Sequence, residues 1–214
     1  MRQAKRMNAG FTLVELSIVL VIIGLIIGGV LTGKQIMENA AITNALNSIQ
    51  AYEAQFQTYV QNYNAIAGDD IAASTRFANS GLPSTSTANG DGTLQGTFDS
   101  ATATDESRLL WAELRAAGLV KGTASNTTQP TNPFNGIFGF QHAAFSAAIA
   151  SNVLCMNNIA GDAAQAIDSR LDDGNGKTGT IQAMIGTGVV GEAVSGTTVA
   201  TYSADKTYTM CIRL

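Results

Sequence analysis

The residue best placed to do chemistry is Glu15, a carboxylate inside an otherwise apolar run. The run covers residues 11–33 and contains no other charged side chain. In the middle of a lipid bilayer an ionised carboxylate is unfavourable, by roughly 3 kcal/mol, unless a cation or a proton neutralises it. Glu15 therefore needs a cationic partner, unless it lies close enough to the membrane interface to reach water.

The apolar run itself has the length and composition of one membrane span. It is longer than the apolar core of a secretory signal, and it continues into polar helical sequence without a small-residue cleavage site. Arg2, Lys5 and Arg6 precede it, and no acid lies among the first ten residues. This positive flank predicts a cytoplasmic N-terminus, with everything after Lys34 facing the periplasm or the exterior.

The segment after the span predicts a continuation of the same helix. Its apolar residues recur every three or four positions: Ile42, Leu46, Ile49, Tyr52, Phe56, Val60 and Tyr63. No proline occurs before Pro83, and Gly68-Asp69-Asp70 is the first strong stop signal. A helix of about 53 residues would be about 80 Å long. Its first half must therefore be buried in lipid or, at another stage, among neighbouring subunits.

The remaining sequence predicts a small α+β domain. The pattern indicates helices from an N-cap at Thr104 to Gly118 and over 162–171, with a long loop before the first. Strand-like runs lie at 137–145, 152–156, 180–184 and 207–213. The predicted fold class is α+β: a long N-terminal helix, transmembrane in its first half, packed on a small antiparallel sheet. The domain organisation is a basic leader (1–10), a transmembrane half-helix (11–33), an amphipathic half-helix (34–64) and a globular domain (65–214).

The start of the apolar run carries a specific motif. Gly10 followed by Phe11-Thr-Leu-Val-Glu15, after a short basic leader, resembles the cleavage and methylation signal of type IV pilins and type II secretion pseudopilins. The resemblance implies that a prepilin peptidase cleaves after Gly10 and that Phe11 becomes the methylated N-terminus. It also implies that Glu15 contributes to assembly. Because the new amine stays cationic after methylation, it is a suitable partner for Glu15, most usefully in an adjoining subunit.

Four glycines of the span have the spacing of a helix-packing motif. Gly24 with Gly28, and Gly29 with Gly33, would allow another helix to approach closely. The alternative is that glycine is simply frequent in membrane spans. Many type IV pilins have a proline where this chain has Thr32, so any kink here must come from the glycines.

Cys155 and Cys211 are the only cysteines, and both lie on the exported side of the predicted membrane. The oxidising compartment favours a disulfide between them, and two buried free thiols are the alternative. The resemblance supports the disulfide, because many pilins tie their C-terminal region in this way. Such a bond would stabilise the fold by about 4 kcal/mol in the chain-entropy treatment.

Other candidate sites are weaker. Asp172, Asp173 and Asn175 offer oxygen ligands for Ca²⁺, but their spacing lacks the alternation and closing glutamate of an EF-hand loop. A turn that ends the preceding helix is the favoured interpretation. His142, the only histidine, has no catalytic motif near it. We therefore expect no enzymatic activity and no cofactor.

The charge balance gives no reason to expect nucleic acid as a partner. Lysine and arginine number 12 against 16 acids; without Arg2, Lys5 and Arg6 the balance is 9 against 16, a net charge of −7.

Together these features predict a prepilin whose mature form is a structural subunit of a type IV pilus-like filament, serving pilus assembly and possible adhesion or motility roles. The chain length, two cysteines and extended polar loops favour a pilin over the alternative, a pseudopilin of type II secretion. A minor tip pilin that binds a surface or DNA is a further alternative. The expected partners are other copies of the chain or related subunits, a prepilin peptidase and methylase, and an inner-membrane assembly platform. The precursor would be a single-pass inner-membrane protein, and the assembled form a periplasmic or extracellular filament.

Overall fold

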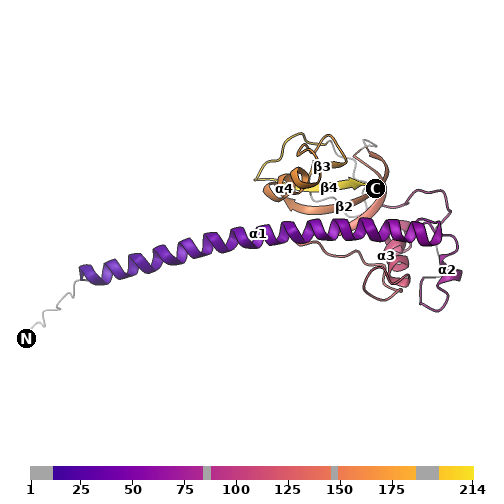
Figure 1. Cartoon of the computed structure of the whole chain (residues 1–214), viewed down its shortest axis with the longest axis horizontal. Coiled ribbons are helices and arrows are strands. Elements are labelled where there is room, and N and C mark those ends of the chain that lie inside the picture. Colours follow the sequence, from indigo (N-terminus) through magenta and orange to yellow (C-terminus); the bar gives the residue numbers. More distant parts are fainter. Residues whose placement is uncertain (1–11, 84–87, 146–148, 187–197) are drawn as a thin grey trace, which may run out of the picture. The chain divides into compact units, whose positions relative to one another are not determined.

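A computed structural model describes residues 12–83, 88–145, 149–186 and 198–214. The chain divides into two compact units, Met1–Ala40 and Ala41–Leu214. One helix, α1 (Leu13–Tyr63), is unbroken over 51 residues and belongs to both units (Figure 1). The apolar and amphipathic segments therefore form a single helix, as the sequence predicts.

The described part of the first unit is the beginning of α1, which contains the apolar run. Among the described residues, α1 is the one helix long and apolar enough to cross a membrane, with a mean hydropathy of 2.7 over its best 18-residue window. No residue of that window is buried within the chain. This surface is thus available to lipid or to another protein.

Within the second unit, α1 buries one face against the globular body. The buried residues are spaced three, four or seven positions apart, as expected for one face of a helix: Ile42, Ala45, Ile49, Phe56 and Tyr59. Half-buried side chains flank this line: Leu46, Tyr52, Val60 and Tyr63. The predicted amphipathic face is therefore confirmed, with Ala45 and Tyr59 as additional members.

The sheet is antiparallel and four-stranded, in the order β1-β2-β4-β3. Its strands are β1 (Phe138–Ala144), β2 (Ile149–Ala160), β3 (Ile181–Ile185) and β4 (Thr207–Arg213). All four predicted strand regions are present, and β2 is longer than the sequence suggested. Alternate residues separate the two faces. Leu154 and Met156 of β2 join the main core with α1, whereas Val153 and Cys155 join a smaller cluster with Phe98.

Three shorter helices complete the fold: α2 (Ala73–Arg76), α3 (Glu106–Ala116) and α4 (Gly161–Leu171). The short α2 was not predicted. The N-cap of α3 is Asp105 rather than Thr104, and its side chain caps no backbone N–H. Instead, Asp105 Oδ2 accepts a hydrogen bond from Ser100 Oγ at 2.5 Å. The carboxylate therefore binds the preceding loop and not the first backbone N–H groups of α3. Gly118, at φ +72°, follows the end of α3 as predicted.

Aromatic side chains connect α1, α3 and β1 in the main core. Trp111 of α3 is fully buried, and its ring lies 5.1 Å from that of Tyr52 and 5.2 Å from that of Phe140. Phe56 of α1 stacks on Phe140 at 5.5 Å. These large rings fix the sheet and α3 on the second half of α1 (Figure 1).

Loops of the same chain cover both edges of the sheet. On the β1 edge, the N–H groups of Phe138 and His142 donate to the carbonyls of Pro130 and Leu94 at 2.8 and 3.0 Å. On the β3 edge, the N–H of Ala183 donates to the Gly176 carbonyl at 2.8 Å, and the Ala183 carbonyl accepts from Val199 at 3.0 Å. The edge strands thus have backbone partners within the chain.

Candidate functional site

The carboxylate of Glu15 lies at the start of α1 and bonds to Thr12. Glu15 Oε2 accepts hydrogen bonds from the Thr12 backbone N–H and from Thr12 Oγ1, both at 2.9 Å. In return, the Glu15 N–H donates to Thr12 Oγ1 at 3.2 Å. This reciprocal arrangement is a capping box, which satisfies two backbone donors that a helix N-terminus otherwise leaves without partners.

The capping box gives Glu15 a second role that the sequence analysis missed. The signal was present as threonine followed three residues later by glutamate, immediately before a helical apolar run. The positive end of the helix dipole also favours a carboxylate at this position. Glu15 thus has partial electrostatic compensation within its own chain.

Gly10 and Phe11 lie outside the described residues. Cleavage after Gly10, methylation of Phe11 and pairing of its amine with Glu15 therefore remain predictions. The described helix begins at Leu13, two residues after the predicted new N-terminus. In the sequence, Phe11 and Glu15 are four positions apart.

The span glycines line a shallow, open groove of about 760 Å³ on one side of α1. Its lining consists of Gly24, Leu25, Gly28, Gly29, Thr32, Gly33 and Ile36. A Cβ atom added at any of the four glycines would meet nothing within 4 Å. The chain itself therefore leaves room at these positions for another helix, although the role in packing stays a prediction.

Cys155 and Cys211 form a disulfide in the structure. They occupy directly opposed positions on β2 and β4, and both are fully buried. The bond connects the two central strands of the sheet, in the smaller cluster that also contains Phe98.

The acidic residues after α4 shape a turn. Asp172 Oδ2 accepts from the Ile181 N–H at 2.8 Å, and Asp173 accepts from the Asn175 N–H at 2.8 Å and from Thr178 Oγ1 at 2.6 Å. Asn175 Oδ1 accepts from the Lys177 N–H at 3.1 Å. Oxygens of Asp168, Asp172 and Asp173 lie within 4.8 Å of one another. These bonds agree with the interpretation as a helix-ending turn.

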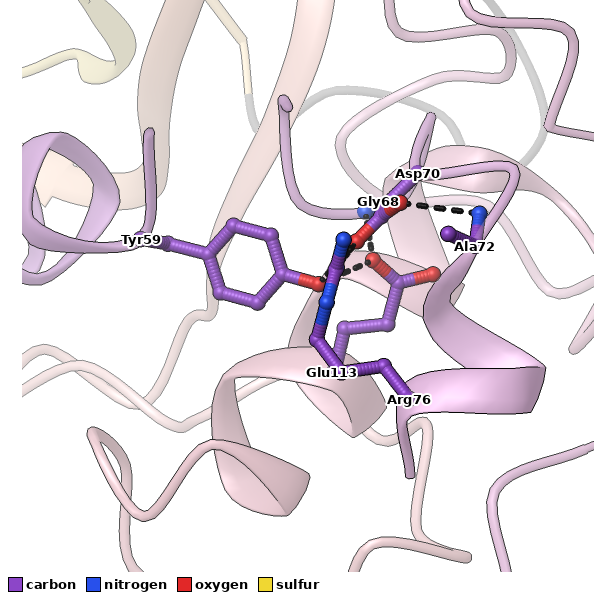
Figure 2. A network of polar contacts seen from close by, with 6 residues as sticks. All are labelled: Tyr59, Gly68, Asp70, Ala72, Arg76 and Glu113. Carbon is purple, nitrogen blue, oxygen red and sulfur yellow. Dashed lines mark hydrogen bonds and ion pairs between the residues drawn. The ribbon is translucent and has the colours of Figure 1, made fainter. Parts of the chain in front are cut away.

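A polar cluster, not predicted from the sequence, joins α1, α2 and α3; three of its side chains are buried and the fourth, that of Arg76, is partly exposed. It consists of Tyr59, Asp70, Arg76 and Glu113 and is called the Tyr59 cluster below. The Tyr59 hydroxyl donates to Asp70 Oδ2 at 2.8 Å and lies 3.3 Å from Glu113 Oε2. The Gly68 N–H donates to the same Glu113 oxygen at 2.7 Å. Figure 2 shows these groups pointing toward one another.

Burial dominates the electrostatics of this cluster. Burial, together with the nearby Asp70 carboxylate, raises the pKa of Glu113 to about 8, against the lowering effect of the Gly68 N–H. Burial and the Glu113 charge likewise raise the pKa of Tyr59, so its hydroxyl remains a donor. Arg76 forms an ion pair with Asp70. The cluster thus contains one compensated carboxylate and one that favours its protonated form.

Comparison with known proteins identifies the leader region. The prokaryotic N-terminal methylation motif matches residues 5–31. A search of curated proteins finds no match for the chain. The motif is the leader signal of type IV pilins and pseudopilins, and here it lies on the long apolar helix of an α+β protein. These features support a pilin-like or pseudopilin-like protein, and the proteins that this motif marks are structural subunits. The apolar helix and the motif are consistent with a membrane-anchored precursor.

Proposed function

We propose that the chain is a prepilin whose mature form is a structural subunit of a type IV pilus-like filament. The observation that carries this proposal is the apolar half of α1, which has no buried residues in its membrane-length window and begins at a motif for cleavage and methylation. A prepilin peptidase would cleave after Gly10 and methylate Phe11. An inner-membrane platform would then transfer the subunit into the filament.

Assembly of this kind needs little change in solvation. The apolar half of α1 would leave lipid and enter a bundle of similar helices, and both environments are apolar. The groove at Gly24, Gly28, Gly29 and Gly33 would let neighbouring helices approach closely. The energy to extract the subunit from the membrane would come from an external motor, so the subunit itself needs no catalytic residues.

Glu15 would make the subunit register specific. In the single chain the carboxylate caps its own helix, as its bonds to Thr12 show. In the filament it would also pair with the methylated amine of Phe11 in an adjoining subunit, because a buried carboxylate is strongly favoured by a cation. The apolar surface would supply most of the association energy.

Two substitutions separate the capping role of Glu15 from its charge. Glu15→Gln keeps an oxygen that can accept from Thr12 but removes the charge, whereas Glu15→Val removes both. Since the proposal depends on the charge, both variants should insert and be cleaved, and both should be absent from sheared surface filaments. The measurements are intact mass, with the mature chain expected to begin at methylated Phe11, and immunoblots of the filament fraction. Normal incorporation of Glu15→Gln would refute the pairing.

A pseudopilin of type II secretion is the second candidate, favoured by the same leader motif. The two candidates differ in where the filament is found. A pilin subunit should be the main component of purified surface fibres, whereas a pseudopilin should be required for export of secreted proteins. A minor tip pilin should occur in the fibres at low abundance. The net charge of −7 after removal of the leader argues against unaided binding of DNA at such a tip.

A further inference from the structure

We propose that the Tyr59 cluster is a proton-operated latch, which fastens residues 64–77, including α2, to α1 and α3 while Glu113 is protonated and loosens when Glu113 ionises. The cluster lies in the second unit and does not include any residue of the predicted assembly machinery. The latch is therefore independent of whether the chain is a pilin or a pseudopilin.

The first basis of the latch is a shortage of donors. The Tyr59 hydroxyl has one proton, and two carboxylate oxygens lie within 3.3 Å of it. Its shorter bond, at 2.8 Å, is to Asp70, and the Gly68 N–H is the other donor to Glu113. When Glu113 is ionised, it competes with Asp70 for the same hydroxyl. When it is protonated, that competition is removed.

The second basis is the charge balance. The charged and titratable groups that face Glu113 are Tyr59 from α1, Asp70 from the loop after α1, and Arg76 from α2. Arg76 pairs with Asp70, so the cluster is neutral when Glu113 carries a proton and has a net charge of −1 when it does not. Tyr59, Asp70 and Glu113 are at most 3% exposed, and a net charge in such a site is strongly disfavoured.

The third basis is what the cluster holds in place. Asp70 Oδ1 accepts from the Ala72 N–H at 2.9 Å, immediately before α2. The Arg76 guanidinium lies over the Tyr63 ring, 4.7 Å from its centre. Phe77 meets the same ring edge-on at 5.5 Å. The segment from Asp70 to Phe77 is therefore attached to α1 in part through Asp70 and Arg76, the charged groups nearest Glu113 (Figure 2).

Opening of the latch would alter a neighbouring cavity. A cavity of 480 Å³ lies at the end of α1, and Asp70 and Arg76 form part of its wall together with Tyr63. Ile71, which is 68% exposed, also lines it. Because Asp70, Ile71 and Arg76 belong to the latched segment, ionisation of Glu113 should change the cavity and the surface around it.

Hydrogen exchange of the full mature chain in detergent micelles tests the latch directly. Exchange would be measured by mass spectrometry from pH 5 to pH 9 and corrected for intrinsic exchange rates. We expect protection of peptides from 64–77 to fall by up to about tenfold per pH unit as the pH rises from the ordinary carboxyl range toward the raised Glu113 pKa of about 8, and to level off above it, since one proton is released on opening. Peptides from β2 and β4, which open only when the whole domain unfolds, should remain more strongly protected than 64–77 at every pH. Uniform protection of 64–77 across this range would overturn the proposal.

Variants identify the group responsible. Glu113→Gln mimics the protonated form and should keep 64–77 protected at high pH, whereas Asp162→Asn, an exposed acid on α4, should behave like the parent chain. Arg76→Met removes the only cation of the cluster, so the transition should move to higher pH. A transition that persists unchanged in Glu113→Gln would also overturn the proposal. Should Glu113→Gln fail to fold, the shift in Arg76→Met still decides, because an unshifted transition excludes Glu113.

Discussion

Two buried glutamates on α3, Glu106 and Glu113, bind protons more tightly in the folded chain than carboxyls usually do. Burial raises the pKa of Glu106 to about 7, with Asp69 adding to the effect, and burial raises the pKa of Glu113 to about 8. Both side chains are at most 1% exposed. Between the ordinary carboxyl pKa and these raised values, the folded state holds more protons than the unfolded state.

The free energy of unfolding should therefore fall as the pH rises from about 4.5 to about 8. The stabilising effect is complete below the unfolded pKa and is lost as the pH passes through each folded pKa. For one group the slope is at most about 1.4 kcal/mol per pH unit. Urea unfolding in detergent at several pH values measures this slope, and Glu113→Gln should reduce it. A free energy that rises with pH over this range would contradict the prediction.

Gly68 is required by both its conformation and its surroundings. Its φ is +90°, and a Cβ atom added there would lie 2.4 Å from the Glu106 carbonyl oxygen. Gly92 has a similar φ of +86°, but nothing lies within 4 Å of an added Cβ. Gly92→Ala should therefore reduce the free energy of unfolding by about 1 kcal/mol, from backbone strain alone. Gly68→Ala should reduce it by clearly more, because overlap adds to the strain; equal losses in urea unfolding would refute this explanation.

The motif at the start of the apolar run could be recognised from the sequence because its residues lie close together, and the methylation motif matches this region. Gly10, Phe11 and Glu15 form one short motif, and the Thr12 cap lies inside it. The Tyr59 cluster was not predictable in the same way, since its hydrogen bonds join residues 11 and 54 positions apart. In the sequence, Asp70 appears only as part of a helix stop signal and Glu113 only as one acid within a helix.

At the scale of elements, the disulfide between β2 and β4 should be a main source of stability. Its partners are 56 residues apart in sequence, and closing a loop of this length removes about 4 kcal/mol of conformational freedom from the unfolded chain. The double variant Cys155→Ala with Cys211→Ala should lose a large part of that stability in urea unfolding. Reduction of the parent chain should produce a similar loss. A loss of unfolding free energy below about 1 kcal/mol would contradict this explanation, because it would mean that the unfolded chain gains little conformational freedom when the disulfide is removed.

Elements with a strong local period were predicted well. The helix predicted from the 3.6-residue pattern and the strands predicted from the strand-like runs are present in the structure. Each of these elements buries one continuous line of side chains. The short α2 escaped prediction because four residues cannot show a period. Thr104 was assigned as the cap of α3 on residue type alone. The structure instead begins the helix after Asp105, whose carboxylate binds Ser100 of the preceding loop.

At the scale of the whole molecule, the two compact units should be separable. The second unit, Ala41–Leu214, contains the core, the sheet and the disulfide, whereas the first consists of apolar helix. A fragment starting at Ala41 should fold, remain monomeric in water and fail to polymerise, because it lacks the apolar half of α1. Light scattering coupled to gel filtration measures its mass, with the mature chain in detergent as the comparison. Filaments formed by the fragment alone would show that α1 is not the assembly element.

The loops along the outer strands have a further consequence for how copies of this protein can associate. An unpaired outer strand invites another chain to continue the ladder, and such growth is hard to reverse. Here Phe138, His142 and Ala183 already use their amide groups inside the chain. In the proposed filament, closely packed globular domains could therefore touch without pairing their sheet edges into amyloid-like ribbons. Contacts between them are then left to side chains, which can be undone when a fibre is dismantled.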